Sequence, residues 1–179
     1  AALGVTMQEL MSDPDKWQEE YNALIGSHLL IPNQTSYTKR DIELLCEEIH
    51  PSFLIIDQID KIEGFKADRE DLLLGSIYQW ARELAKEYCP IIAVCQADGS
   101  GENVKYLTMA NVANAKTAKQ AEADWILGIG KIHDPGWGNV RFINISKNKL
   151  FGDEDTDPAR KHDRFQVLIE PLTARYKDI

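Results

Sequence analysis

Two short apolar runs on either side of one long amphipathic helix constrain the fold of this chain most strongly. The runs are "FLIID" at residues 53–57 and "IIAVCQ" at residues 91–96. Between them, residues 68–90 carry apolar side chains at helical spacing, namely Leu73, Ile77, Trp80 and Leu84. A strand, a crossover helix and a second strand normally form a parallel pair. Because both runs are apolar throughout, they predict a parallel sheet that is covered on both faces.

Residues typical of helix N-termini predict two helices before this strand–helix–strand unit. The first starts at Ser12 or Asp13 and has Pro14 in its first turn. The second has Thr38 three residues before Asp41, which is the spacing of a capping box. Both helices fit an α/β protein in which helices flank short strands.

The remaining runs predict more strands and one more helix. The helix is expected at residues 115–124, and the strands at residues 27–33, 125–132, 141–150 and 164–171. The later strands follow one another without long helices, so we expect them to be antiparallel and to form a sheet edge. The segment 152–163, "GDEDTDPARKHD", is predicted to be a charged loop. The expected fold is therefore a single α/β domain over residues 1–179, with a mostly parallel twisted sheet, helices on both faces and an antiparallel edge.

Composition excludes several classes of protein. No apolar run approaches the length that crosses a bilayer, so we expect no membrane association. Three widely spaced cysteines predict neither a zinc site nor a disulfide framework and fit a cytoplasmic protein. The formal net charge of −9 argues against binding of duplex DNA over a broad face, although a few local lysines can still line a channel.

The N-terminus carries no localisation signal. The first residues, "AALGVTMQEL", lack the basic start and apolar core of a signal peptide, and they lack an initiator methionine. We therefore expect that the chain begins part-way through a larger protein.

Asp57 and Gln96 are the candidate site residues that the strand pattern itself predicts. Each stands at the end of an apolar run, and ligands of parallel α/β sheets bind at the carboxyl ends of the strands. A carboxylate placed there can hold Mg²⁺ through water beside nucleotide phosphates, which is the Walker B arrangement. An amide on the neighbouring strand can bind a terminal phosphate or a water molecule. Solvation or capping of a strand end by Asp57 is an equally simple interpretation.

These segments, in this order, resemble the RecA-like motor domain of DnaB-like replicative helicases and the helicase half of phage primase-helicases. The resemblance rests on "PSFLIIDQIDKI", "PIIAVCQADGS", "NAKTAKQAEADWILGIGKI" and "FINISKNKLFG", and it is most secure from residue 51 to residue 152. It implies a P-loop NTPase core that uses ATP and Mg²⁺, assembles as a homo-oligomeric ring, expected to be a hexamer, and moves along single-stranded DNA. Such a chain takes part in DNA replication as an ATP hydrolase.

The resemblance also implies roles for individual residues. Asp57 is similar to the Walker B aspartate, and Gln96 to the residue that couples the phosphate state to a DNA-binding loop. Lys147 and Lys149 fall where the family carries paired basic residues that reach the neighbouring subunit's nucleotide. The loop from residue 97 to residue 114 is similar to the family's central-channel loop. The DNA contacts that this implies are Lys105, Asn103, Asn111, Asn114, Lys116 and Lys119.

Two features depart from the family pattern. Lys149 stands where arginine is common, and a lysine lacks the planar bidentate fork of a guanidinium group. No G-x-x-x-x-G-K-[ST] phosphate-binding loop occurs in the 179 residues. We therefore expect the chain alone to be inactive. Two alternatives stay open: a RecA-like recombinase or circadian-clock-type ATPase, and a RecA-like module that assembles with partners or binds nucleic acid without turnover.

Overall fold

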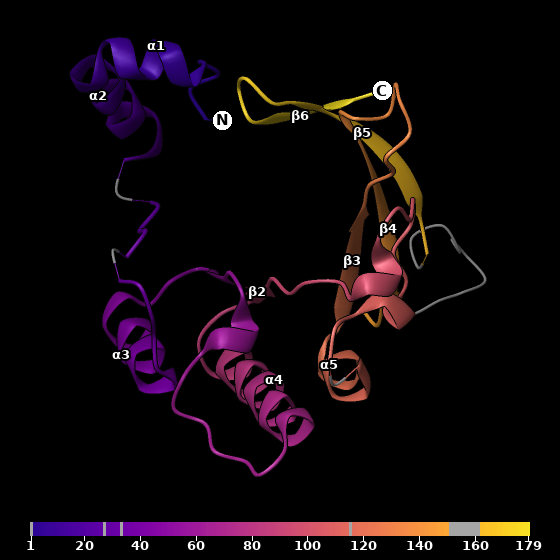
Figure 1. Ribbon diagram of the computed structural model, residues 1–179. Helices are drawn as coiled ribbons and strands as arrows, with labels where there is room; N and C mark the ends of the chain where they lie inside the picture. The colour runs from indigo at the N-terminus through magenta and orange to yellow at the C-terminus, as the bar shows by residue number, and fades with distance from the viewer. Residues whose placement is uncertain (1, 27, 33, 115, 151–161) are drawn as a thin grey trace.

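The protein is a mixed α/β structure with two separate sheets. The computed structural model describes residues 2–26, 28–32, 34–114, 116–150 and 162–179. One sheet is the parallel pair of β1 (Leu54–Ile56) and β2 (Ile91–Ala93). The other is a four-stranded antiparallel sheet in the order β3-β4-β5-β6, shown at the right of Figure 1. Its strands are β3 (Trp125–Gly130), β4 (Val140–Asn148), β5 (Arg164–Glu170) and β6 (Arg175–Asp178).

The predicted strand–helix–strand unit is confirmed. Helix α4 (Glu70–Glu87) joins β1 to β2, and it packs with α3 (Lys39–Ile49) over one face of the parallel pair. The Phe65 and Trp80 rings meet edge to face at a centroid distance of 5.5 Å within this core. The buried residues at its centre are Ile42, Cys46, Ile56, Ile59, Leu74, Ile77, Tyr78, Trp80, Ala81 and Leu84. This core fixes the positions of both strands.

Local capping signals set the ends of the N-terminal helices. Asp13 accepts a hydrogen bond from the backbone of Lys16 and begins α2 (Pro14–Ile25). Thr38 and Asp41 form the predicted capping box of α3. This box also holds the pKa of Asp41 below its ordinary value, through hydrogen bonds from the side chain and backbone of Thr38. A further helix, α1 (Met7–Ser12), was not predicted.

The predicted strand at residues 27–33 is wrong. Residues 28–32 have no regular structure, and Leu30 and Ile31 are exposed. No strand of the described residues runs beside this segment, so its backbone groups have no ladder to join. An apolar run alone therefore does not make a strand.

The expectation of a mostly parallel sheet is also wrong. Among the named strands of the described residues, only β1 and β2 pair in parallel, and the antiparallel strands make a sheet of their own instead of an edge. Helices cover one face of the parallel pair, whereas Ile55 and Ile92 on the other face are exposed. Strand β6 was not predicted, because its residues are polar and its existence depends on the turn at 171–174 before it. Antiparallel pairing of the later strands is confirmed.

A long loop lies directly on the antiparallel sheet. Gly130 permits this contact, because a Cβ atom there would come within 2.0 Å of the carbonyl oxygen of Lys105. Gly128 likewise faces the carbonyl oxygen of Leu107. Behind the loop, Phe142 is fully buried against Tyr106 and Trp137. The loop is therefore packed in place and contains two short 3-10 turns, η2 (Gly99–Gly101) and η3 (Met109–Asn111).

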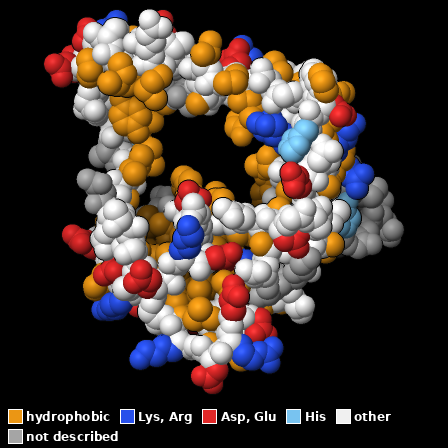
Figure 2. Space-filling model, in the orientation of Figure 1, with side chains coloured by type: hydrophobic (Ala, Val, Ile, Leu, Met, Phe, Trp, Pro, Cys, Tyr) orange, Lys and Arg blue, Asp and Glu red, His pale blue; other side chains and the backbone are white. Residues whose placement is uncertain are grey.

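The chain encloses an opening. Figure 2 shows this opening near the centre of the molecule, with hydrophobic side chains on its rim. The N-terminal segment completes the ring, since Arg175 of β6 donates a hydrogen bond of 3.2 Å to the carbonyl oxygen of Ala2. Within the described part of the chain, no helix is long and apolar enough to pass through a bilayer. The predicted charged loop at 152–163 lies outside the described residues except for its last two positions.

Candidate functional site

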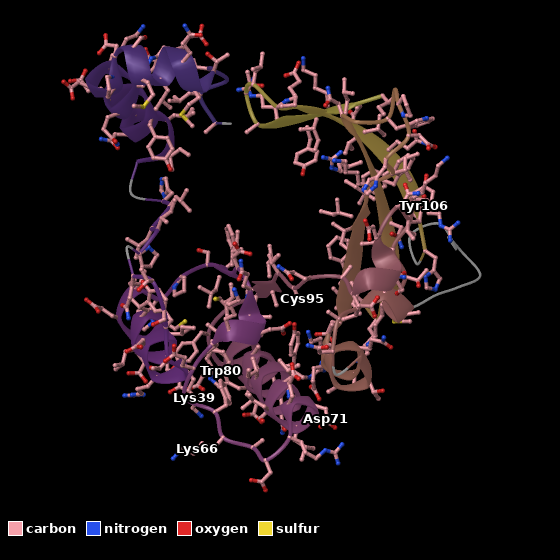
Figure 3. The ribbon with its side chains drawn as sticks, viewed as in Figure 1. Lys39, Lys66, Asp71, Trp80, Cys95 and Tyr106 are labelled. Atoms are coloured by element: carbon pink, nitrogen blue, oxygen red, sulfur yellow. The ribbon has the colours of Figure 1, made fainter. Side chains whose placement is uncertain are left out.

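Asp57 and Gln96 lie at the same edge of the parallel pair. The register aligns Leu54 with Ile91 and Ile56 with Ala93, so both strands end at this edge. Pairing continues past β2, where the Val94 amide donates to the carbonyl oxygen of Ile56 at 2.9 Å. Figure 3 shows the edge at Cys95, between Val94 and Gln96. The predicted proximity of the two strand ends is therefore present in the structure.

A sharp turn leaves the Asp57 carboxylate in solvent. Gln58 adopts a left-handed conformation with φ of 53°, and the chain then enters η1 (Ile59–Lys61). Ile59 anchors this turn because its side chain is fully buried and its amide donates to the carbonyl oxygen of Val94 at 3.2 Å. Among the described residues, the side chains of Asp57 and Gln96 are exposed and make no hydrogen bond or ion pair. Both groups are thus available to a ligand.

The carboxyl edge of the parallel pair carries one exposed carboxylate, that of Asp57, rather than a cluster of metal ligands. No group of three His, Cys, Asp or Glu side chains in the described ranges is placed to hold a metal ion. Magnesium typically keeps several water molecules and takes only one or two protein carboxylates beside substrate phosphates. A single exposed aspartate fits that kind of site.

The loop from residue 97 to residue 114 starts directly at Gln96. Its two ends meet in an isolated antiparallel bridge between Ala97 and Val112. The Ala113 amide donates to the carbonyl oxygen of Gln96 at 3.2 Å. A displacement of Gln96 would therefore move both ends of the loop together.

The three asparagines of this loop serve its own structure. Asn103 accepts a hydrogen bond of 2.8 Å from the backbone of His133. Asn111 accepts from Thr108 and donates to Ser100, which ties the two 3-10 turns together. Asn114 donates to Glu70 at the start of α4, at 3.0 Å. These contacts use part of each side chain and hold the loop against its neighbours.

Lys105 is the cation of the loop, and it stays exposed. Its Nζ atom lies 5.1 Å from the ring centroid of Trp137 and 5.4 Å from that of Phe142. Tyr106 meets the Phe142 ring edge to face and lies beneath Arg164. Tyr106 therefore anchors the loop, whereas the charge of Lys105 remains near the surface.

Lys119 does not fit the predicted DNA contact. It lies on α5 (Lys116–Glu122), its side chain is only 3% exposed, and Nζ lies 2.6 Å from Oδ2 of Asp60. The Tyr78 hydroxyl donates to Oδ1 of the same carboxylate at 2.9 Å. Burial, then Cys95 and Asp60, raise the pKa of Tyr78 above its ordinary range. Lys116 begins the same helix, and its side chain lies outside the described part of the structure.

Sequence reasoning missed the role of Asp60. Its place in a polar turn three residues after Asp57 favours a solvated side chain, but the structure gives Asp60 an ion pair with the buried Lys119 and a hydrogen bond from Tyr78. These partners come from two different helices, 18 and 59 positions along the chain. No local spacing predicts contacts of that kind. Lys119, within the alanine-rich segment 115–124, was the available sign, since a lysine on a packed helix needs a counter-charge.

Lys147 and Lys149 both cap the carboxyl end of α5. Lys147 donates to the carbonyl oxygen of Gln120, and Lys149 donates to that of Ala121 at 2.8 Å. Cations at this position stabilise the exposed carbonyls and the negative pole of the helix. Burial, followed by a hydrogen bond with Lys149 and the charge of Lys149, lowers the pKa of Lys147. In this chain the paired lysines thus donate to carbonyl oxygens of α5 in their own chain.

Comparison with known proteins identifies the fold. No protein-family model matches the sequence, and no curated protein matches it. A solved structure of a DnaB-like replicative helicase, described together with its interactions with primase, matches with a TM-score of 0.75. The identity is 12%, and the match covers 99% of this chain but 46% of that one. The chain therefore shares its fold with part of a DnaB-like replicative helicase and spans less than half of that protein's length.

Proposed function

We propose that this chain is part of an ATP-driven replicative DNA helicase that moves along single-stranded DNA as a homo-oligomeric ring, expected to be a hexamer. The observation that carries the proposal is the shared edge of β1 and β2. At this edge Asp57 and Gln96 follow neighbouring strands at the start of a long packed loop, and neither side chain has a partner among the described residues. A nucleotide site and a polymer-binding loop joined at one residue are what a translocating motor requires. The fold match supports the same RecA-like motor.

Asp57 and Gln96 take the nucleotide roles. Asp57 would hold Mg²⁺ through water, and the metal ion would neutralise charge on the phosphates when ATP is bound. Gln96 would donate its amide to the terminal phosphate or to a water molecule beside it. Because Gln96 also carries one end of the loop through its backbone, loss of that phosphate would shift residues 97–114.

Lys105 is the centre of the proposed DNA path. It is the one basic residue between positions 97 and 114, and it is exposed. Asn103 and Asn114 lie in the same loop and keep unused hydrogen-bonding capacity after the contacts described above. Lys119 is left out of this path because it is buried and paired with Asp60. A short basic path fits a protein with a net charge of −9 better than a broad cationic face would.

Lys147 and Lys149 are proposed to act on the neighbouring subunit's nucleotide. They would have to exchange the carbonyl oxygens of α5 for phosphate oxygens. Because its pKa is lowered, Lys147 loses part of its positive charge at alkaline pH. A bound phosphate anion would raise that pKa again. The caps on α5 are the competing, purely structural role of this pair.

A non-catalytic RecA-like module is the second candidate. It is favoured by one observation, which is that no phosphate-binding loop occurs in the 179 residues. The helicase motor and the non-catalytic module differ in whether a segment from outside these residues would add ATP hydrolysis.

The test is ATP hydrolysis by a version of the protein extended at its N-terminus with any residues that its gene encodes before Ala1. The 179-residue chain is expected to show no turnover. The extended version is expected to release phosphate from ATP and Mg²⁺, and to do so faster with single-stranded DNA. An extended version that folds and binds single-stranded DNA but releases no phosphate would favour the non-catalytic module.

Lys105→Ala is expected to weaken binding of single-stranded DNA by about 2- to 10-fold at low salt. Loss of one phosphate contact should lower the slope of log affinity against log salt by about 0.7. Fluorescence anisotropy with a labelled oligonucleotide over a series of salt concentrations measures both quantities. Lys66→Ala, in the exposed segment before α4, is the matched control. An unaltered salt slope in Lys105→Ala would place the DNA path elsewhere.

A further inference from the structure

Four side chains beside the carboxyl edge of the parallel pair form one polar network. Nζ of Lys119 lies 2.6 Å from Oδ2 of Asp60, and the Tyr78 hydroxyl of α4 donates to Oδ1 of the same carboxylate at 2.9 Å. The Cys95 thiol hydrogen bonds with the same hydroxyl group. Lys119 and Tyr78 are 3% and 8% exposed, so the centre of the network lies inside the protein.

Two members of this network are close in sequence to the candidate site residues. Asp60 stands three positions after Asp57, in η1. Cys95 directly precedes Gln96, and Figure 3 shows Cys95 at the carboxyl edge. A movement of either strand end therefore reaches the one hydroxyl group that Asp60 and Cys95 share.

Helix α5 connects the network to the loop from residue 97 to residue 114. A Cβ atom at Gly75 of α4 would lie 3.6 Å from that of Ala118, so α4 and α5 are in close contact (Figure 1). Gln120, the residue after Lys119, donates to the carbonyl oxygen of Met109 in η3 at 2.7 Å. Neighbouring residues of one short helix thus contact the turn after β1 and the loop.

A buried lysine is not needed simply to hold α5 in place. An ion pair in the interior requires desolvation of both charges, and well-packed apolar residues often stabilise a fold as well. Apolar contacts, however, are non-directional. Hydrogen bonds to a charged carboxylate are short and directional, so those of Lys119 and Tyr78 to Asp60 define one arrangement of α4, α5 and η1. Such an arrangement is suited to transmitting a small displacement.

We propose that Lys119, Asp60 and Tyr78 are positioning residues that couple the carboxyl edge of the parallel pair to the 97–114 loop, and so ATP to single-stranded DNA. The second half of this inference rests on the proposed function. A displacement of the turn that contains Asp60 would move Lys119 and α5, and α5 would move η3 at Met109. The backbone of Gln96 moves the ends of the loop directly, whereas the network acts on η3.

The nucleotide dependence of DNA affinity tests this coupling. Fluorescence anisotropy gives the Kd of a labelled single-stranded oligonucleotide for the extended version, with Mg²⁺ and either a non-hydrolysable ATP analogue or ADP. The double variant Asp60→Asn, Lys119→Met is expected to bring the ratio of the two Kd values at least about 5-fold closer to one. Tyr78→Phe, which removes only the hydroxyl group, is expected to bring it at least about 2-fold closer.

A surface ion pair provides the matched control. Glu20→Gln with Lys16→Met removes an exposed pair of α2, and it should leave the ratio of Kd values within about 1.5-fold of the unsubstituted protein. Because the ratio compares two states of the same variant, it is not altered by a lower yield of folded protein. A merely structural role of the network would therefore leave the ratio unchanged.

Amide hydrogen exchange in the 179-residue chain tests the connection to the loop without any nucleotide. The Asn111 amide of η3 donates to the carbonyl oxygen of Thr108 at 3.0 Å, and it is expected to exchange at least about 10-fold faster in the double variant. The Ile169 amide of β5, which donates to the carbonyl oxygen of Asn139 at 2.7 Å, is the internal control. A network that contributes only to overall stability would change both exchange rates by the same factor.

The outcomes separate this inference from the proposed function. ATP hydrolysis by the extended version, together with a ratio of Kd values that the double variant leaves unchanged, would support the motor and overturn the coupling. Absence of ATP hydrolysis would overturn the motor. Faster exchange at Asn111 would then still support the connection between the network and the loop, and equal changes at Asn111 and Ile169 would overturn that connection too. If the double variant fails to fold, Tyr78→Phe decides both measurements.

Discussion

Asp57→Asn is expected to lower ATP hydrolysis by the extended version at least about 100-fold. Asparagine keeps the size of the side chain but removes the negative charge that, in the proposed function, would hold Mg²⁺ beside the phosphates. A metal ion of this kind contributes several kcal/mol of charge stabilisation to the transition state, and about 2.7 kcal/mol corresponds to 100-fold in rate. The measurement is phosphate release at saturating single-stranded DNA over a series of Mg²⁺ concentrations.

The structure provides a matched control for this substitution. Asp68 is an exposed carboxylate in the segment before α4. Asp68→Asn changes the net charge equally and should leave turnover within about 2-fold. Asp57 makes no hydrogen bond to described residues, so Asp57→Asn should also leave the unfolding midpoint unchanged. Unchanged phosphate release in Asp57→Asn would remove this carboxylate from the mechanism.

The features that sequence reasoning located correctly are those set by local rules. Capping at Asp13 and Thr38, the long helix α4 and the strands on either side of it depend on residues a few positions apart. The common edge of Asp57 and Gln96 follows from one topological rule, because parallel strands end on the same side. These features needed no knowledge of distant partners.

The features that sequence reasoning missed depend on partners far along the chain. Leu30 and Ile31 look like part of a strand, yet no strand lies beside them in the described structure. The expected single sheet fails for a similar reason, since β2 and β3 do not meet each other. The family resemblance implied a DNA contact for Lys119, whereas the structure pairs it with Asp60, 59 residues away in the sequence.

The asparagines of the 97–114 loop illustrate a further limit. The composition and position of the loop indicate a polar binding loop. The structure shows that the asparagine side chains make hydrogen bonds within the chain. A long loop that must lie on a sheet has to satisfy its backbone groups, and Asn side chains do so at low steric cost. Polar residues in such a loop therefore serve its internal structure, whereas the Lys105 side chain makes no hydrogen bond within the described residues.

Lys119→Met is expected to destabilise the chain by about 3 kcal/mol. The substitution keeps the aliphatic stem but leaves the half-buried Asp60 carboxylate without its counter-charge, and breaking a buried pair from one side is strongly unfavourable. The Tyr78 hydroxyl still donates to Asp60 and limits the loss. Urea unfolding followed by tryptophan fluorescence should show a fall in the midpoint of about 1–2 M. Lys61→Met, at an exposed lysine next to Asp60, is the control and should shift the midpoint little.

A double substitution distinguishes the ion pair from simple packing. Asp60→Asn with Lys119→Met removes both charges, and the amide introduced at position 60 can still accept the Tyr78 hydrogen bond. The double variant is therefore expected to be more stable than Lys119→Met alone, with a coupling free energy of about 1–3 kcal/mol. Additive effects would mean that Lys119 contributes through its stem. Coupling would show that the charge pair fixes α5 to the turn after Asp57. Helix α5 also contacts the 97–114 loop, because the Gln120 side chain donates to the carbonyl oxygen of Met109 at 2.7 Å. That route joins the edge of Asp57 and Gln96 to the far end of the loop, in addition to the direct connection at Gln96.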